Sequence, residues 1–173
     1  MDTATQIPPP GRANLFLAGL QTGLLAVIVM LAWLGASAMW NGRTFWTAPN
    51  QMASIFHGND AISGRFSSTT PSGIAVYVIA YTLLGAIFAV LVPRRLTVFG
   101  DMLFGVLIAI GWYWLWFRAL GPTVMPLVWM LHSERSVTFG HVIYGVLLAR
   151  YPLYLVVPAA AQSAAAVPLT TEN

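Results

Sequence analysis

The chain has 173 residues, of which 58 % are hydrophobic and only 8 % are charged. A soluble domain carries about 25 % charged residues, and no water-soluble fold of this size buries so much apolar surface. The net charge is +3, but the eight basic residues are all arginines at the ends of apolar stretches. This scatter excludes the basic stripe of a nucleic-acid-binding protein, and the absence of cysteine excludes disulfides and thiolate ligands. The composition predicts a membrane protein.

Four apolar stretches are long enough to cross a bilayer as helices, which takes about 20 residues each. The fold class predicted is an all-α membrane protein, a compact bundle of four transmembrane helices over residues 13–157. The spans are expected at about 13–39, 72–92, 96–117 and 136–157. Residues 1–12, which include three consecutive prolines, and residues 158–173 are predicted to be flexible tails.

The two halves of the chain have the same order of segments. Each half has a span, an outer connection with a short apolar segment, and a second span. The stretch VYVIAYTLLGAIFAVLVP can be laid beside GHVIYGVLLARYP so that Tyr81 matches Tyr144. This match favours two repeated helical hairpins related by an axis along the membrane normal. Chance similarity between apolar helices is the alternative.

The placement of arginines predicts the orientation in the membrane. The predicted spans divide the arginines equally between the two sides, but Pro93-Arg94-Arg95 forms a tight charged turn, whereas the arginines of the other side lie in long loops. We therefore expect a multi-pass protein of the bacterial inner (cytoplasmic) membrane. Both termini would be cytoplasmic, and the long connections would lie outside.

The three histidines, His57, His132 and His141, are all expected on the outer side. Histidine ligates haem iron, copper and zinc, so a haem b site between two of them, or a zinc site completed by Asp60 or Glu134, is one interpretation. However, the chain has neither an HxxxH pair nor a CxxCH attachment motif. We therefore predict no metal ligands and no cofactor, with haem b or a bound lipid as alternatives.

His141 and Tyr144 lie three residues apart in the last span and therefore share one helix face. As polar groups inside a membrane they are candidates for ligand binding, together with His57 and His132. A pocket for haem, quinone or lipid near His141 and Tyr144 is one interpretation. A polar clasp between helices is the other, and we favour it.

Three charged residues are candidates for buried or interfacial positions: Asp101, Arg118 and Arg150. Asp101 is expected to pair with Arg94 or Arg95. Arg150 is expected to reach the cytoplasmic headgroups by extending its side chain along the helix.

Small residues recur along the spans and allow helices to approach closely. Gly19 and Gly23 form a GxxxG pair in the first span. Gly140 and Gly145 flank the polar residues of the last span. We expect these four glycines to lie at helix contacts.

The segment VMPLVWMLHSERSVTFGHVIYGVLLARYP carries a Gly-His-x-x-Tyr-Gly signature at Gly140, His141, Tyr144 and Gly145. In this it resembles a group of small four-span bacterial and archaeal membrane proteins of unknown function with that signature in the final helix. The four-span layout covers nearly the whole chain, whereas the signature covers only its last part. Arg150-Tyr151-Pro152 departs from the small apolar residues typical after the signature. The resemblance implies a four-span layout, but it assigns no activity, because the group has no known function.

No nucleotide loop, HExxH motif or serine elbow is present, so the chain is not expected to be an enzyme. We expect an accessory or stabilising subunit of a larger membrane complex, in contact with membrane lipids and with another membrane protein or itself. A haem-, quinone- or lipid-binding protein is the first alternative. A small transporter or channel is the second.

Overall fold

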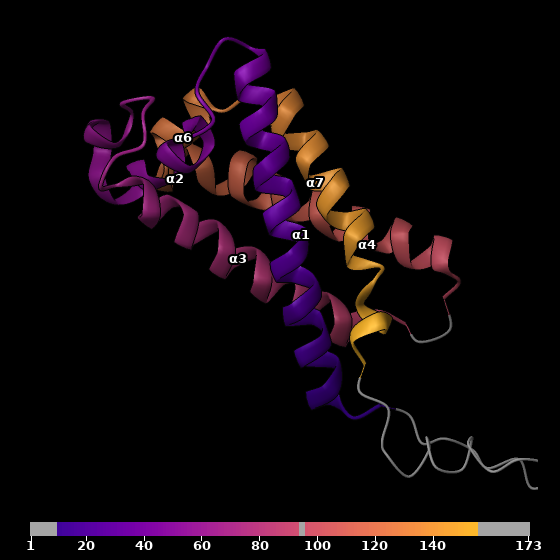
Figure 1. Cartoon of the computed structure of the whole chain (residues 1–173). Helices are drawn as coiled ribbons and strands as arrows, with labels where there is room; N and C mark the ends of the chain where they lie inside the picture. The colour runs from indigo at the N-terminus through magenta and orange to yellow at the C-terminus, as the bar shows by residue number, and fades with distance from the viewer. Residues whose placement is uncertain (1–9, 94–95, 156–173) are drawn as a thin grey trace, which may run out of the picture.

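The computed structural model describes residues 10–93 and 96–155, and within these ranges the chain consists of helices and loops without a strand (Figure 1). The four longer helices are α1 (Arg12–Trp40), α3 (Thr70–Leu91), α4 (Val98–Tyr113) and α7 (Glu134–Leu148). The connections contain α2 (Thr47–His57), the turn η1 (Gly58–Ala61), the π-helical η2 (Trp114–Leu120), α5 (Gly121–Val124), α6 (Pro126–Leu131) and the turn η3 (Tyr151–Tyr154).

Three stretches of the described chain are helical, long and apolar enough to cross a membrane: α1, α3 and the continuous helix Val98–Val124. This confirms the all-helical membrane class and three of the expected spans. The last helix is shorter than expected, because α7 ends at Leu148 rather than at residue 157. Its 15 residues rise about 22 Å at about 1.5 Å per residue, less than the hydrocarbon thickness of about 30 Å.

Proline and a threonine cap set the ends of the second and third spans. Pro71 occupies the first turn of α3, where a missing N–H costs nothing. At its other end α3 stops before Pro93, which forces Val92 into an extended conformation. Thr97 then caps the start of α4, because its hydroxyl accepts a hydrogen bond from the Gly100 N–H at 3.1 Å.

Glycines bring the helices into backbone contact in both halves of the chain. A Cβ atom added to Gly85 of α3 would lie 2.6 Å from the Gly19 carbonyl oxygen and 2.6 Å from the Gly23 Cα atom of α1. A Cβ atom added to Gly145 of α7 would lie 2.6 Å from the Cα atom of Val106 in α4. Because these neighbours are backbone atoms, only glycine permits the observed spacing. Gly19, Gly23 and Gly145 thus lie at helix contacts.

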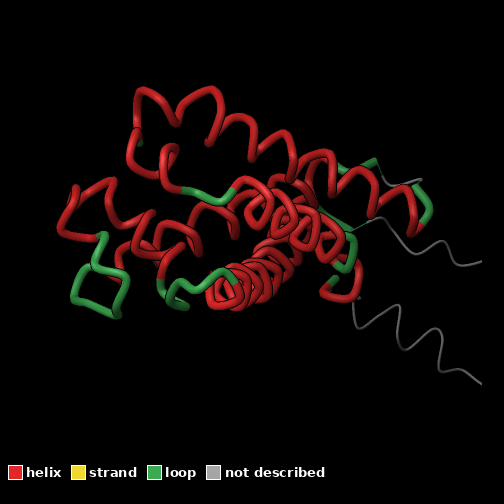
Figure 2. Tube along the Cα trace, turned by 90° about the horizontal axis from the view of Figure 1, so that it is seen from above, coloured by secondary structure: helices red, strands yellow, loops and turns green. Residues whose placement is uncertain are grey.

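Helix α7 packs against both α1 and α4, and the helices cross at an angle when viewed from above (Figure 2). After α7 the chain turns back onto the bundle, where the Tyr151 ring lies 5.8 Å from the Phe88 ring near the end of α3. The described chain therefore begins and ends at the same end of the bundle (Figure 1). The opposite end carries α2, α6 and the long connections.

Candidate functional sites: a buried tyrosine–histidine cluster and an open arginine cavity

A group of aromatic polar residues lies in the core where α3, α4 and α7 meet. We call it the tyrosine–histidine cluster, and it consists of Tyr77, Tyr81, Tyr113, His141 and Tyr144. His141 is 1 % exposed and Tyr144 is 0 % exposed. The two candidates that the sequence places on one helix face are thus both enclosed by protein.

Hydrogen bonds inside the cluster satisfy the imidazole and two phenols. Nδ1 of His141 lies 2.7 Å from the Val137 carbonyl oxygen, and because a carbonyl only accepts, this nitrogen carries the proton. Nε2 therefore accepts, and the Tyr81 hydroxyl donates to it at 2.6 Å. The Tyr144 hydroxyl donates to the backbone carbonyl of Tyr81. The cluster ties α7 to α3 through two hydrogen bonds.

Ring contacts extend the cluster to α4. The centroids of Tyr113 and His141 lie 5.3 Å apart in an edge-to-face arrangement, and those of Tyr81 and Tyr144 lie 5.1 Å apart. Such offset and edge contacts are the favoured geometries of aromatic pairs. A cavity beside Tyr77 and Tyr81 has a volume of about 20 Å³, room for about one water molecule. In this conformation the cluster joins α3, α4 and α7 through hydrogen bonds and ring contacts.

Of the other histidines, one lies near the cluster and one lies apart from it. The His132 ring lies 4.8 Å from the Phe117 ring and 6.2 Å from the Tyr113 ring, and both of these rings also contact His141. His57 is exposed at the end of α2, where Nε2 lies 3.2 Å from the Ser72 hydroxyl. In residues 10–93 and 96–155 no group of three His, Cys, Asp or Glu side chains is arranged to hold a metal ion.

Two of the three charged candidates lie at the ends of helices, and the third, Arg118, lies within η2. Asp101 is in the first turn of α4 and is buried, but the expected partners Arg94 and Arg95 lie outside the described residues. Arg118 pairs with Glu134 at 2.6 Å on a half-exposed surface. Such an exposed pair contributes about 0–1 kcal/mol. Arg150 is exposed, just beyond the end of α7.

Gly140, the last of the packing candidates, faces α1. A Cβ atom on Gly140 would lie 3.3 Å from side-chain atoms of Met30 and Trp33. This is a tight fit against side chains, which can move, unlike the backbone contacts of Gly145. The Trp33 indole also donates to the Ser136 carbonyl at 2.9 Å, so the start of α7 is fastened to α1.

Two adjoining cavities open at the end of the bundle that carries α2 and α6. We call them together the Arg43 cavity. They have volumes of about 240 and about 300 Å³ and share the lining residues Arg43, Thr47 and Gln51. The first is also lined by Leu34, Ala38, Asn41, Ala48, Ser133, Ser136 and Val137, and the second by Thr44, Asn50, Ile62, Gly64 and Leu131.

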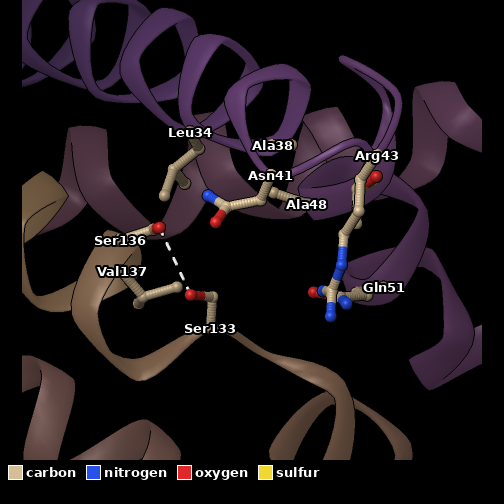
Figure 3. A pocket seen from close by; sticks show the side chains of 10 residues that line it. Leu34, Ala38, Asn41, Arg43, Ala48, Gln51, Ser133, Ser136 and Val137 are labelled. Atoms are coloured by element: carbon tan, nitrogen blue, oxygen red, sulfur yellow. Dashed lines mark hydrogen bonds between the residues drawn. The ribbon is translucent and has the colours of Figure 1, made fainter.

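The polar groups of the Arg43 cavity come from segments far apart in the sequence. In Figure 3 the Arg43 guanidinium lies beside the Gln51 amide, and Ser133 and Ser136 lie across the space from them. Gln51 Nε2 donates to the Leu131 carbonyl at 2.7 Å, and Arg43 Nη1 reaches the same oxygen at 3.4 Å. One carbonyl thus receives both donors, and the longer contact leaves the guanidinium weakly held.

Sequence patterns did not reveal Arg43, Gln51 or Tyr113 as site residues. Tyr81 had one signal, its match to Tyr144 between the two halves of the chain. The partners of Arg43 come from α2 and from the α6–α7 connection, and no periodicity within one helix indicates such a meeting.

Comparison of the chain with protein-family models, curated proteins and solved structures finds no match.

Proposed function

We propose that this chain is a non-enzymatic, four-span protein of the bacterial inner membrane that serves as an accessory or stabilising subunit of a larger membrane complex. The supporting observation is the exposed side of the third span. Only 22 % of the apolar window in Val98–Val124 is buried, against 44 % in α1 and 39 % in α3. Phe99, Leu103 and Leu107, spaced four residues apart, form an exposed apolar stripe on α4.

Another transmembrane helix is the partner that this stripe fits. Lipid tails are as apolar as leucine, so helices in a membrane associate through close packing and polar contacts rather than through exclusion of water. Gly111 continues the stripe one turn beyond Leu107, and an added Cβ atom there would meet nothing within 4 Å. A partner helix would find both apolar side chains and a close-approach point along α4.

The polar side chains of the tyrosine–histidine cluster make their hydrogen bonds within the protein, and this supports a structural role rather than an enzymatic one. His141, Tyr81 and Tyr144 direct their hydrogen bonds at one another or at backbone carbonyls. A general acid or base must instead reach a substrate atom, directly or through one water.

The proposal includes α7 as the fourth span and both termini in the cytoplasm. Two observations support an even number of crossings. The described chain begins and ends at the same end of the bundle, and α7 packs between the spans α1 and α4. Reporter fusions at the two termini test this topology. Signals from opposite faces of the membrane would exclude it.

The partner surface is tested by a matched pair of substitutions. Leu107 on α4 and Ile79 on α3 are both 61 % exposed. We expect Leu107→Trp to reduce the amount of partner that copurifies in mild detergent by at least fivefold, and Ile79→Trp to leave it unchanged. Quantitative mass spectrometry of the purified material measures both. Equal amounts of partner with the two variants, or a wild-type protein that purifies alone, would refute the proposal.

The two alternatives remain predictions with direct tests. A Soret band in the absorption spectrum of gently solubilised protein would show haem and would favour the ligand-binding function near His141 and Tyr144. Ion or proton flux in proteoliposomes would favour a transporter or channel.

A further inference from the structure

The Arg43 cavity has more hydrogen-bond donors than its own acceptors use. Arg43 carries five N–H donors, and its described contact is one long bond to the Leu131 carbonyl. None of the lining residues of the two cavities is acidic. The ion pair of the described chain joins Arg118 to Glu134 instead. The positive charge of Arg43 is therefore without a counter-charge from residues 10–93 and 96–155.

Side-chain donors of other kinds surround this charge. Gln51 and Asn41 contribute amide groups, and one N–H of each donates to a backbone carbonyl, at Leu131 and Ser37 respectively, which leaves the second N–H of each amide for a ligand. The Ser133 hydroxyl donates to the Ser136 hydroxyl at 3.2 Å. Figure 3 shows the Asn41 amide and the two serines facing the open space from the side opposite Arg43. A guanidinium with amides and hydroxyls around it is suited to an oxyanion, because each oxygen accepts several hydrogen bonds.

The position of the cavity along the helices indicates where the oxyanion comes from. The cavity lies where α1 ends, next to Trp40, which is 92 % exposed. Phe45 and Trp46 follow in the same connection and pack edge to face, with ring centroids 5.1 Å apart. Tryptophan and other aromatic residues gather at the level of the lipid headgroups. These aromatic residues favour a position of the cavity at the depth of the lipid phosphates.

We infer that the Arg43 cavity binds the phosphate of an anionic phospholipid, with the Arg43 guanidinium as its main contact and the neighbouring amides and serine hydroxyls completing the site. This site is separate from the proposed partner surface on α4, so either holds without the other. Volumes of about 240 and about 300 Å³ accommodate a headgroup, while the acyl chains remain in the surrounding bilayer. The occupant is a lipid rather than a soluble phosphate because the cavity opens at headgroup depth.

The first test measures headgroup preference. The full-length protein in neutral detergent is titrated with phosphatidylglycerol or phosphatidylcholine, and native mass spectrometry counts the bound lipids. Both lipids carry a phosphate, but choline neutralises it, so we expect phosphatidylglycerol to bind at least tenfold more tightly. Equal binding of the two lipids would overturn the inference.

Two substitutions locate the effect. Arg43→Gln removes the charge and keeps a polar group, and we expect the preference for phosphatidylglycerol to fall at least tenfold. Arg65→Gln is the matched control, because Arg65 is exposed in the same connection and lines neither cavity. Its preference should stay within twofold of wild type. Equal losses in the two variants would show general attraction to basic residues and would overturn the site.

A further measurement requires no variant and so does not depend on the fold of Arg43→Gln. A phosphatidylglycerol with a photoreactive headgroup is expected to label residues 41–51 or 131–137 of the wild-type protein. Labelling confined to the end of the bundle that carries Arg150 would overturn the inference. Inorganic phosphate is then added as a competitor. Displacement of the lipid only at high millimolar concentration supports a lipid site, and phosphate binding as tight as that of the lipid would overturn it in favour of a soluble ligand.

Discussion

The tyrosine–histidine cluster and the Arg43 cavity both gather polar side chains from distant segments, yet they differ in what those side chains bind. In the cluster, His141 and Tyr81 are buried and bond each other at 2.6 Å. In the cavity, Arg43 is exposed and its described bond is 3.4 Å long. The cluster therefore uses its hydrogen bonds within the protein, whereas the cavity has donors left for a ligand.

The headgroup-level position inferred for the cavity and the interior position of the cluster would account for this difference. Leaving a polar group unpaired far from water costs about 1–3 kcal/mol, and His141, Tyr81 and Tyr144 avoid this cost, whereas the buried indole N–H groups of Trp112 and Trp116 have no partner among the described residues. Near the headgroups, water and lipid phosphates satisfy whatever the protein does not. The Arg43 guanidinium at the end of α1 therefore lies where solvent and headgroups can complete its hydrogen bonds, whereas His141 inside α7 has both ring nitrogens bonded within the protein.

The largest expected effect comes from the helix contact beside the cluster. Gly145→Ala places a Cβ atom 2.6 Å from the Val106 Cα atom and 2.7 Å from the Gly105 carbonyl oxygen. Because backbone atoms cannot move aside, α7 must shift away from α4, at a cost of about 3 kcal/mol. Unfolding in mixed micelles with increasing dodecyl sulfate, followed by circular dichroism, measures this loss. Gly111→Ala is the control, since an added Cβ there meets nothing within 4 Å, and it should unfold like the wild type or later.

The next effect tests whether the cluster is a clasp. His141→Ala empties buried space and leaves the Tyr81 hydroxyl without its acceptor, so we expect about 2 kcal/mol of destabilisation. The same micelle titration measures it. His57→Ala, at an exposed histidine bonded to Ser72, should change stability by less than about 0.5 kcal/mol. Similar losses for the two histidines would contradict the distinction between buried and interfacial histidines.

The cluster was only partly predictable from the sequence. His141 and Tyr144 share a face because of their spacing on one helix, and that spacing is visible in the sequence. Their partner Tyr81 lies 60 residues from His141, and helical periodicity carries no information on such a distance. The fourth span was expected at about 136–157, with two options for its helix: an end at Pro152, which was favoured, or continuation to residue 157. The helix instead ends at Leu148, and Pro152 lies in the turn η3. Residues 156 and 157 lie outside the described residues.

The Arg43 cavity was not predictable, for a related reason. Its walls are the end of α1, the start of α2 and the α6–α7 connection. Long apolar stretches in a sequence indicate the spanning helices, but they do not predict how the polar connections fold over the ends of those helices. Arg43 and Arg65 cannot be distinguished in the sequence, since both are arginines of one long loop. Only the three-dimensional structure shows that Arg43 lines the cavity and Arg65 does not.

A smaller effect isolates one hydrogen bond of the cluster. Tyr81→Phe keeps the ring contacts and removes the hydroxyl that donates to His141, so we expect a loss of about 1 kcal/mol, near the upper range for polar contacts in membranes. In a protein that already carries His141→Ala the same change should cost almost nothing, because the partner is absent. An undiminished cost in that background would mean that Tyr81 acts through another group.

Arg43→Gln is expected to have the smallest effect on stability, although its effect on lipid binding is expected to be large. Without lipid, Arg43→Gln should shift the free energy of unfolding by less than about 0.5 kcal/mol, because the guanidinium is exposed and Gln51 holds the Leu131 carbonyl independently at 2.7 Å. With phosphatidylglycerol added, the wild type should gain stability in proportion to lipid occupancy and Arg43→Gln should gain little, since a ligand stabilises only the state that binds it. Tyr81→Phe should show the reverse pattern, less stable without lipid but stabilised as much as wild type with it. If lipid stabilised Arg43→Gln and wild type equally, the Arg43 cavity would bind lipid no more specifically than the rest of the protein surface at headgroup level.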